Sequence, residues 1–123
     1  MMHPGFVLLY VNNLDTSVAF YNEFLALQPV EHSGGFALYV LPSGLKFGLW
    51  LRETVQPAVT AQAGAMELAI VMADQPALDA QYDVLRHQRV AIAQAPVQME
   101  FGYTCVVLDP DGHRLRLFAP GEA

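Results

Sequence analysis

The side chains of this sequence that could bind a metal ion or act as a nucleophile do not stand at the spacings typical of a metal site or of a catalytic pair. The only cysteine is Cys105, and the sequence places no histidine beside it that could activate a thiolate. The four histidines stand at positions 3, 32, 87 and 113, and no two of them have the His-x-x-x-His spacing of a helical metal site. Asp109 and Asp111 belong to an Asp-Pro-Asp-Gly run, which is typical of a tight turn and not of an acid–base pair.

The composition of the chain argues against some classes of binding partner. The chain has 123 residues and a net charge of −6, with six Lys and Arg in total and 54% hydrophobic residues. Six cations do not form a stripe that follows phosphates, so we expect neither nucleic acid nor an anionic membrane surface as a partner. The single cysteine and an N-terminus without a basic leader predict a cytoplasmic protein. So large an apolar fraction predicts a pocket or a subunit interface besides the core.

The first half of the chain must supply the elements that position any site. A continuous apolar run over residues 6–11 predicts a buried strand. Apolar residues recur at helical spacing from Leu14 to Leu25, after an Asn-Asn pair, and predict an amphipathic helix. Pro29 is expected to end this helix. Short strands are predicted over residues 30–33, 36–41 and 46–52, separated by Gly-Gly and Pro-Ser-Gly turn signals.

The second half repeats this order. A strand over 66–73 is followed by a helix over 75–88 and by strands over 90–95, 100–108 and 115–119. We therefore predict one α+β domain over residues 1–123 that contains two βαβββ modules, over about 5–52 and 65–120, with a linker over 53–64. Each module has one helix for one face of its sheet, so two modules could form a half-barrel around a shared cavity.

Three stretches resemble a known family. LYVNNLDTSVAFYNEFLALQPV resembles the opening strand and helix of the vicinal oxygen chelate superfamily, the group of glyoxalases, bleomycin resistance proteins and extradiol dioxygenases. CVVLDPDGHRLRLFAP, which begins at Cys105, resembles its closing hairpin, and the Asp-Pro-Asp-Gly turn is the most specific signature. KFGLWLRETVQP resembles an aromatic-bearing strand of the branch with phenazine- and bleomycin-type resistance proteins. The resemblance covers nearly the whole chain.

The resemblance implies four places for metal ligands, two in each module, and these places correspond to Phe6, Gly48, Glu67 and Arg116. Phenylalanine and glycine offer no ligand atom, and arginine has no acceptor. One carboxylate does not hold a catalytic divalent ion, which needs about three protein ligands. The neighbours Val7, Phe47, Leu49, Leu115 and Leu117 are no better, so the sequence predicts no metal and no other cofactor.

The remaining polar pair and the aromatic residues are candidates for ligand binding. If the family's strand order holds, Glu67 and Arg116 either anchor a ligand or form an ion pair that fills the vacated site. Trp50 shares strand parity with Gly48 and is either a stacking wall for a planar ligand or a core residue. We expect Phe6 to pack over Gly48 from an adjacent strand. Further candidates for the pocket are Phe36, Tyr39, Phe101 and Tyr103, each of which could equally be core.

Three functions follow from these expectations. The first is a homodimeric, metal-free protein that binds a planar aromatic toxin or antibiotic and sequesters it. The second is a glyoxalase-like lyase or isomerase, or a dioxygenase, with a remodelled metal site around Glu67. The third is a protein that keeps only the fold, with its cavity filled by side chains.

Overall fold

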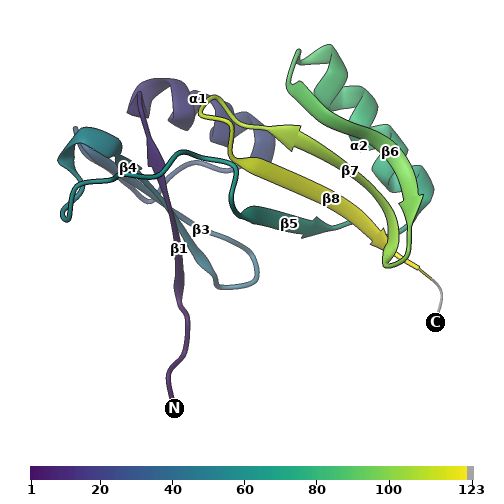
Figure 1. Cartoon of the computed structure of the whole chain (residues 1–123), viewed down its shortest axis with the longest axis horizontal. Helices are drawn as coiled ribbons and strands as arrows, with labels where there is room; N and C mark the ends of the chain where they lie inside the picture. Colours follow the sequence, from purple (N-terminus) through teal and green to yellow (C-terminus); the bar gives the residue numbers. More distant parts are fainter. Residues whose placement is uncertain (122–123) are drawn as a thin grey trace. The chain divides into compact units, whose positions relative to one another are not determined.

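The computed structural model describes residues 1–121 and divides into two compact units, Met1–Ala61 and Gln62–Ala123. Each unit has the order strand, helix and three strands, which confirms the predicted α+β fold with two βαβββ modules (Figure 1). The shared cavity and the homodimer stay predictions.

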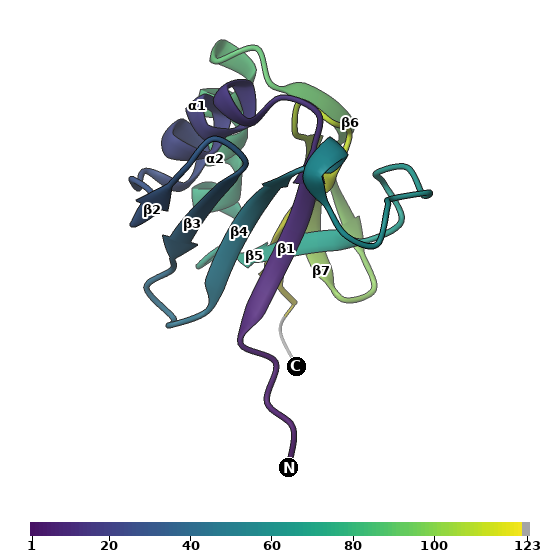
Figure 2. The same ribbon diagram turned by 90° about the vertical axis from the view of Figure 1, so that its left-hand side faces the viewer.

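The first unit is a mixed four-stranded sheet with one helix. Its strands lie side by side in the order β1-β4-β3-β2, with β1 parallel to β4 and the other neighbours antiparallel (Figure 2). The elements are β1 (Phe6–Val11), α1 (Leu14–Leu25), β2 (Glu31–His32), β3 (Phe36–Val40), β4 (Lys46–Leu51) and the short 3-10 helix η1 (Arg52–Thr54).

The second unit has the same topology. Its sheet runs β5-β8-β7-β6, and β5 is parallel to β8. The elements are β5 (Glu67–Val71), α2 (Gln75–His87), β6 (Ala91–Met99), β7 (Gly102–Leu108) and β8 (Arg114–Pro120).

Both helices begin at a side-chain cap. The Asn13 side chain accepts a hydrogen bond from the Thr16 backbone N–H at 2.9 Å, and Asp74 does the same for Ala77 at 2.9 Å. Helix α1 ends at Leu25 because Ala26 adopts the left-handed conformation, with φ 54°. The helix therefore stops well before Pro29, which the sequence suggested as the breaker.

Each helix packs on one face of its own sheet. In the first unit the Tyr21 ring meets Phe47 edge-on at 4.9 Å between centroids, and the buried Tyr39 hydroxyl donates to the Val18 carbonyl at 3.3 Å. In the second unit α2 buries Leu78 and Leu85, while Cys105 and Leu115 are buried on the sheet. Tyr39, one of the candidates for the pocket, is therefore a core residue.

Strand β6 is longer than the sequence predicted. It runs from Ala91 to Met99 through Pro96, where residues 90–95 were expected. A proline has no N–H to donate to a neighbouring strand, but β6 is the edge strand of its sheet and has β7 as its neighbour. The register with β7 shifts between Ile92 and Gln94 and again between Gln94 and Val97, so bulges accommodate the proline. The following hairpin also delays β7, which starts at Gly102 and not at Glu100.

Neither helix could cross a bilayer. Helix α1 has 12 residues and α2 has 13, whereas a membrane span needs about 20 apolar residues. This finding applies to the described range, residues 1–121.

Candidate functional site

Each sheet has one face toward its helix and one face turned away from it. Side chains alternate along a strand, so the residues on the second face follow from the register. We call these the first distal face, in Met1–Ala61, and the second distal face, in Gln62–Ala123. The second distal face includes Glu67, Ala69, Thr104, Val106, Arg114 and Arg116. The first distal face consists of Phe6, Leu8, Tyr10, Phe36, Leu38, Val40, Lys46, Gly48 and Trp50.

Gly48 lies under two side chains of the first distal face. A Cβ atom at Gly48 would lie 2.7 Å from Leu8 Cδ2 and 2.9 Å from Phe36 Cζ. Strand β1 is adjacent to β4, as expected, but the register pairs Gly48 with Leu8. Phe6 lies one pleat away, opposite Lys46, whose Nζ is 5.1 Å from the centroid of the Phe6 ring. The predicted packing of Phe6 over Gly48 is therefore wrong: Leu8 and Phe36 make that contact.

Trp50 is half-buried and lies at the carboxyl end of β4. It shares the face of Gly48, as the two-residue spacing predicts, and its register partner on β1 is Tyr10. The two rings meet edge-on, with centroids 6.2 Å apart at 74°. Three large side chains of β1 are exposed to solvent although they are apolar or aromatic: 54% for Phe6, 41% for Leu8 and 38% for Tyr10. The first distal face is therefore a largely apolar surface with aromatic rings at both ends.

Glu67 and Arg116 form a two-pronged ion pair on the second distal face. Arg116 Nε donates to Glu67 Oε1 at 2.8 Å, and Nη2 donates to Oε2 at 2.8 Å. The hydrogen bond from Arg116 holds the pKa of the Glu67 carboxyl below its usual value, and the same contact raises the pKa of Arg116. Of the two interpretations that the sequence left open, these contacts favour the ion pair.

The rest of the Arg116 guanidinium is also engaged. Nη1 donates to Thr104 Oγ1 at 3.2 Å and to Gln94 Oε1 at 3.4 Å. The Phe101 ring lies 5.6 Å from the guanidinium carbon, and it meets Phe118 edge-on at 6.2 Å. The structure therefore brings Phe101 to the Glu67–Arg116 pair.

Tyr103 lies on the opposite face of the same sheet. Val106 is the register partner of Arg116, and Tyr103 lies three positions before Val106 on the same strand, so the Tyr103 and Arg116 side chains point to different faces. The Tyr103 hydroxyl donates to Asp79 of α2 at 2.6 Å. Tyr103 is therefore not part of the second distal face, contrary to the expectation that it lines a pocket with Arg116.

The residues at the four ligand places do not fit a metal ion. Phe6 and Gly48 lack ligand atoms, and both oxygens of Glu67 accept from Arg116. Among residues 1–121 no group of three or more His, Cys, Asp or Glu side chains could hold a metal. Cys105 is buried, which raises the pKa of its thiol, and Asp109 holds the turn by accepting the Asp111 and His113 backbone N–H groups.

Four residues at these surfaces were missed from the sequence: Leu8, Tyr10, Gln94 and Thr104. Leu8 and Tyr10 share the parity of Phe6, so alternation along β1 would have placed them on the same face. Gln94 approaches Arg116 from β6, whose pairing with β7 is bulged, and Thr104 approaches it from β7 across a regular register with β8. No local pattern in the sequence reveals either register.

Comparisons with known proteins agree with this architecture. The family described as "Glyoxalase/Bleomycin resistance protein/Dioxygenase superfamily" matches residues 3–117. A protein from Agrobacterium tumefaciens with a solution NMR structure is 40% identical, with TM-score 0.89, and the match covers 99% of this chain and 100% of that one. A glyoxalase/bleomycin resistance protein/dioxygenase from Nocardioides is 23% identical, with TM-score 0.85 and coverage of 100% and 86%.

A glyoxalase-related enzyme from Fulvimarina pelagi is also similar in fold. It is 23% identical, with TM-score 0.84, and the match covers 97% of this chain and 88% of that one. No functionally curated protein matches the sequence.

Proposed function

This chain belongs to the glyoxalase/bleomycin resistance protein/dioxygenase superfamily, and on that premise we propose that it is a metal-free binding protein for a planar aromatic small molecule. Fold membership alone does not decide between catalysis and binding. The choice rests on the residues that this chain has at the two distal faces.

One observation carries the proposal: the first distal face exposes apolar and aromatic side chains. Phe6, Leu8 and Tyr10 are each more than a third exposed, and Trp50 stands beside Tyr10. A flat conjugated ring that covers this surface would remove apolar area from water and stack on the indole. Such stacking contributes about 1 kcal/mol beyond the burial of area.

The second distal face supports binding over metal-dependent catalysis. A cation at Glu67 would have to break two charge-assisted hydrogen bonds to Arg116, each 2.8 Å long, and would gain one carboxylate. The lyase, isomerase and dioxygenase alternative needs at least two further ligands, and the other family places offer none. Elemental analysis after purification without chelator separates the two: about one transition metal per chain would favour the enzyme.

The ligand class follows from what the faces offer. Because Glu67 occupies Arg116, a carboxylate anchor at Arg116 is not supported, and a neutral planar compound fits better than a carboxylated one. Phenazines and bleomycin-type compounds are the starting panel, since one strand resembles that resistance branch. The cellular role would be sequestration of a toxin or antibiotic in the cytoplasm by a homodimer. Sedimentation at micromolar concentration tests the homodimer.

The experiment uses Trp50, which is the only tryptophan. A ligand stacked on it quenches the indole fluorescence, and the affinity is measured again by equilibrium dialysis, which does not need the fluorophore. We expect Trp50→Ala to weaken binding roughly 30-fold or more, as for a hot-spot aromatic. Tyr82→Ala, which removes an aromatic ring on α2, is the matched control and should bind as wild type does. If no compound quenches below millimolar concentration, or Trp50→Ala binds as tightly as wild type, the proposal is wrong.

A further inference from the structure

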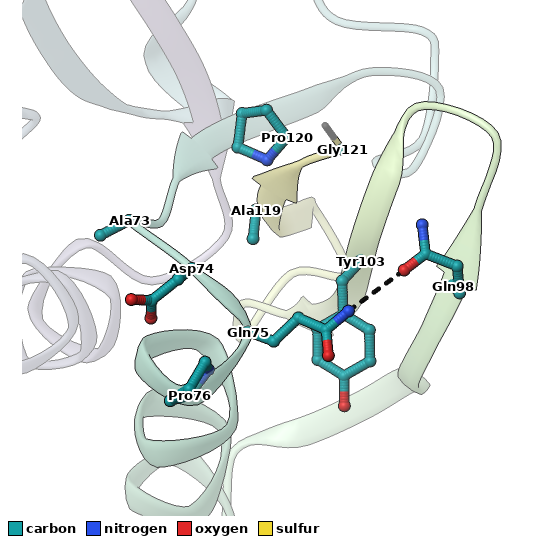
Figure 3. A pocket seen from close by; sticks show the side chains of 9 residues that line it. All are labelled: Ala73, Asp74, Gln75, Pro76, Gln98, Tyr103, Ala119, Pro120 and Gly121. Atoms are coloured by element: carbon teal, nitrogen blue, oxygen red, sulfur yellow. Dashed lines mark hydrogen bonds between the residues drawn. The ribbon is translucent and has the colours of Figure 1, made fainter. Parts of the chain in front are cut away.

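Both units have a pocket at the same place in their topology. In the second unit a pocket of about 530 Å³ lies where β5 and β8 end and α2 begins. Its lining residues are Ala73, Asp74, Gln75, Pro76, Gln98, Tyr103, Ala119, Pro120 and Gly121 (Figure 3). In the first unit a pocket of about 340 Å³ lies where β1 and β4 end, next to Asn12 and Arg52. The βαβββ unit therefore forms this hollow twice, at the carboxyl ends of its parallel strands, where open α/β sheets also bind ligands.

The two pockets differ in charge. Among residues 1–121, none of those that line the second-unit pocket is Lys, Arg or His, and Asp74 is the only charged one. Asp74 also caps α2, so the partial positive charge at the helix start already faces a carboxylate. The first-unit pocket contains Arg52 and Glu53. The second-unit pocket is therefore unsuited to anions.

The wall of the second-unit pocket includes an aromatic ring in a fixed place. The Tyr103 hydroxyl donates to Asp79 at 2.6 Å, which holds the ring against α2. Figure 3 shows the Gln75 and Gln98 side chains reaching toward each other beside this ring, with Ala119 and Pro120 farther along the wall. One aromatic face thus stands next to two amides.

The two amides form a bond that a ligand could replace. Gln75 Nε2 donates to Gln98 Oε1 at 3.3 Å, and both side chains are exposed. The free energy of an exposed hydrogen bond between neutral groups is close to that of the hydrogen bonds that each group makes with water, so separating the two amides costs little. A primary amide inserted between them would accept from Gln75 Nε2 and donate to Gln98 Oε1, giving two hydrogen bonds for one. A carboxylate could not donate to Gln98 and would meet Asp74, and no cation lines the pocket within the described range, residues 1–121.

We propose that this pocket is a second binding site, which takes a small aromatic ring bearing an uncharged amide. The ring stacks on Tyr103, and the amide bridges Gln75 and Gln98. The site lies within Gln62–Ala123 and does not depend on Trp50, so it stands or falls separately from the proposed function.

The test compares benzamide with benzoate, which share the ring and differ in the amide. Each is titrated into the ¹⁵N-labelled full chain, and backbone amide signals are followed by NMR. We expect benzamide to shift the signals of Gln75, Gln98 and Tyr103 saturably, with a dissociation constant on the order of 1 mM, usual for so small a ligand. Benzoate should bind there at least fivefold more weakly. Asn12, at the equivalent place in the first unit, should not respond to benzamide.

Variants test the bridging role. Combining Gln75→Ala with Gln98→Ala should weaken benzamide at least fivefold, since both partners of the amide are lost. Gln88→Ala, an exposed glutamine at the far end of α2, should bind within twofold of wild type. The proposal is overturned if benzamide gives no saturable shift at the pocket, if benzoate binds there as tightly, or if the paired variant binds as Gln88→Ala does.

Discussion

Separating Glu67 from Arg116 would test whether the ion pair holds the second distal face together. The measurement is a double-mutant cycle in urea unfolding, with Glu67→Gln, Arg116→Met and the two combined. Both replacements keep roughly the size of the side chain. The coupling free energy then reports the interaction between the two groups.

The magnitude follows from geometry and exposure. Two hydrogen bonds of 2.8 Å join the groups, and the side chains are 32% and 17% exposed for Glu67 and Arg116. An exposed pair is worth about 0.2–1 kcal/mol, and a charge-assisted bond in a protected place about 1.5–3 kcal/mol. Because solvent still screens Glu67, we expect a coupling of about 1.5 kcal/mol at neutral pH.

Arg114 provides the matched control. Its Nη1 lies 3.9 Å from Glu67 Oε2, and its side chain is 50% exposed. The cycle of Glu67→Gln with Arg114→Met should therefore give a coupling below about 0.5 kcal/mol. Equal couplings for the two arginines, or a value near zero for Arg116, would contradict the reasoning.

Acid adds an independent check. The pKa of Glu67 is lower in the folded protein than its ordinary value of 4.5, so the unfolded chain takes up this proton first as the pH falls. The stabilisation is present in full above pH 4.5 and is lost as the pH drops through the folded pKa. The coupling to Arg116 should decline along the same acid limb, and a coupling that stays constant below pH 4.5 would show that charge is not its source.

Two further changes are predicted in the first unit. Gly48→Ala should lower the free energy of unfolding by about 1 kcal/mol, because its Cβ would lie 2.7 Å from Leu8 Cδ2 and the ends of the Leu8 and Phe36 side chains would have to move aside. Gly34→Ala, with no atom within 4 Å, should not lower it measurably, and urea unfolding compares the two variants. Tyr39→Phe should cost about 1 kcal/mol at pH 7 through the lost hydroxyl contact. Burial raises the pKa of Tyr39 to about 12, so the neutral hydroxyl favours folding below pH 10 and this contribution is lost as the pH rises through 12. The difference in the free energy of unfolding between wild type and Tyr39→Phe should therefore shrink by about pH 11. A difference that does not change with pH would contradict this prediction.

Local patterns predicted the elements well where one principle dominates. The run over residues 6–11 is apolar throughout and forms β1 with those bounds, and the Asp-Pro-Asp-Gly turn lies before β8 as expected. The predicted strand ended before Pro96, whereas β6 continues through it to Met99. The effect of a proline on a strand depends on whether the strand has one neighbour or two. That is a property of the sheet and not of the segment.

The candidate site was harder to predict because it depends on register. The parity of Gly48 and Trp50 lies within one strand and was predicted from the sequence. The residue over Gly48 depends on how β1 aligns with β4, and a slip of two residues keeps the same face while exchanging Phe6 for Leu8. Whether the Tyr103 side chain shares a face with Arg116 depends on how β7 aligns with β8, because an odd change of register moves a side chain to the other face.

The bulged edge strand β6 also affects how the protein behaves at high concentration. It has nine residues and exposes Ile92, Val97 and Met99, and a flat strand of this kind would be a template on which a second chain could add its own backbone. Two register shifts twist its outer edge, and Pro96 contributes no N–H to it. We therefore expect chains that meet along β6 to find an interrupted row of hydrogen-bonding groups, which disfavours the addition of a second chain's strand at this edge.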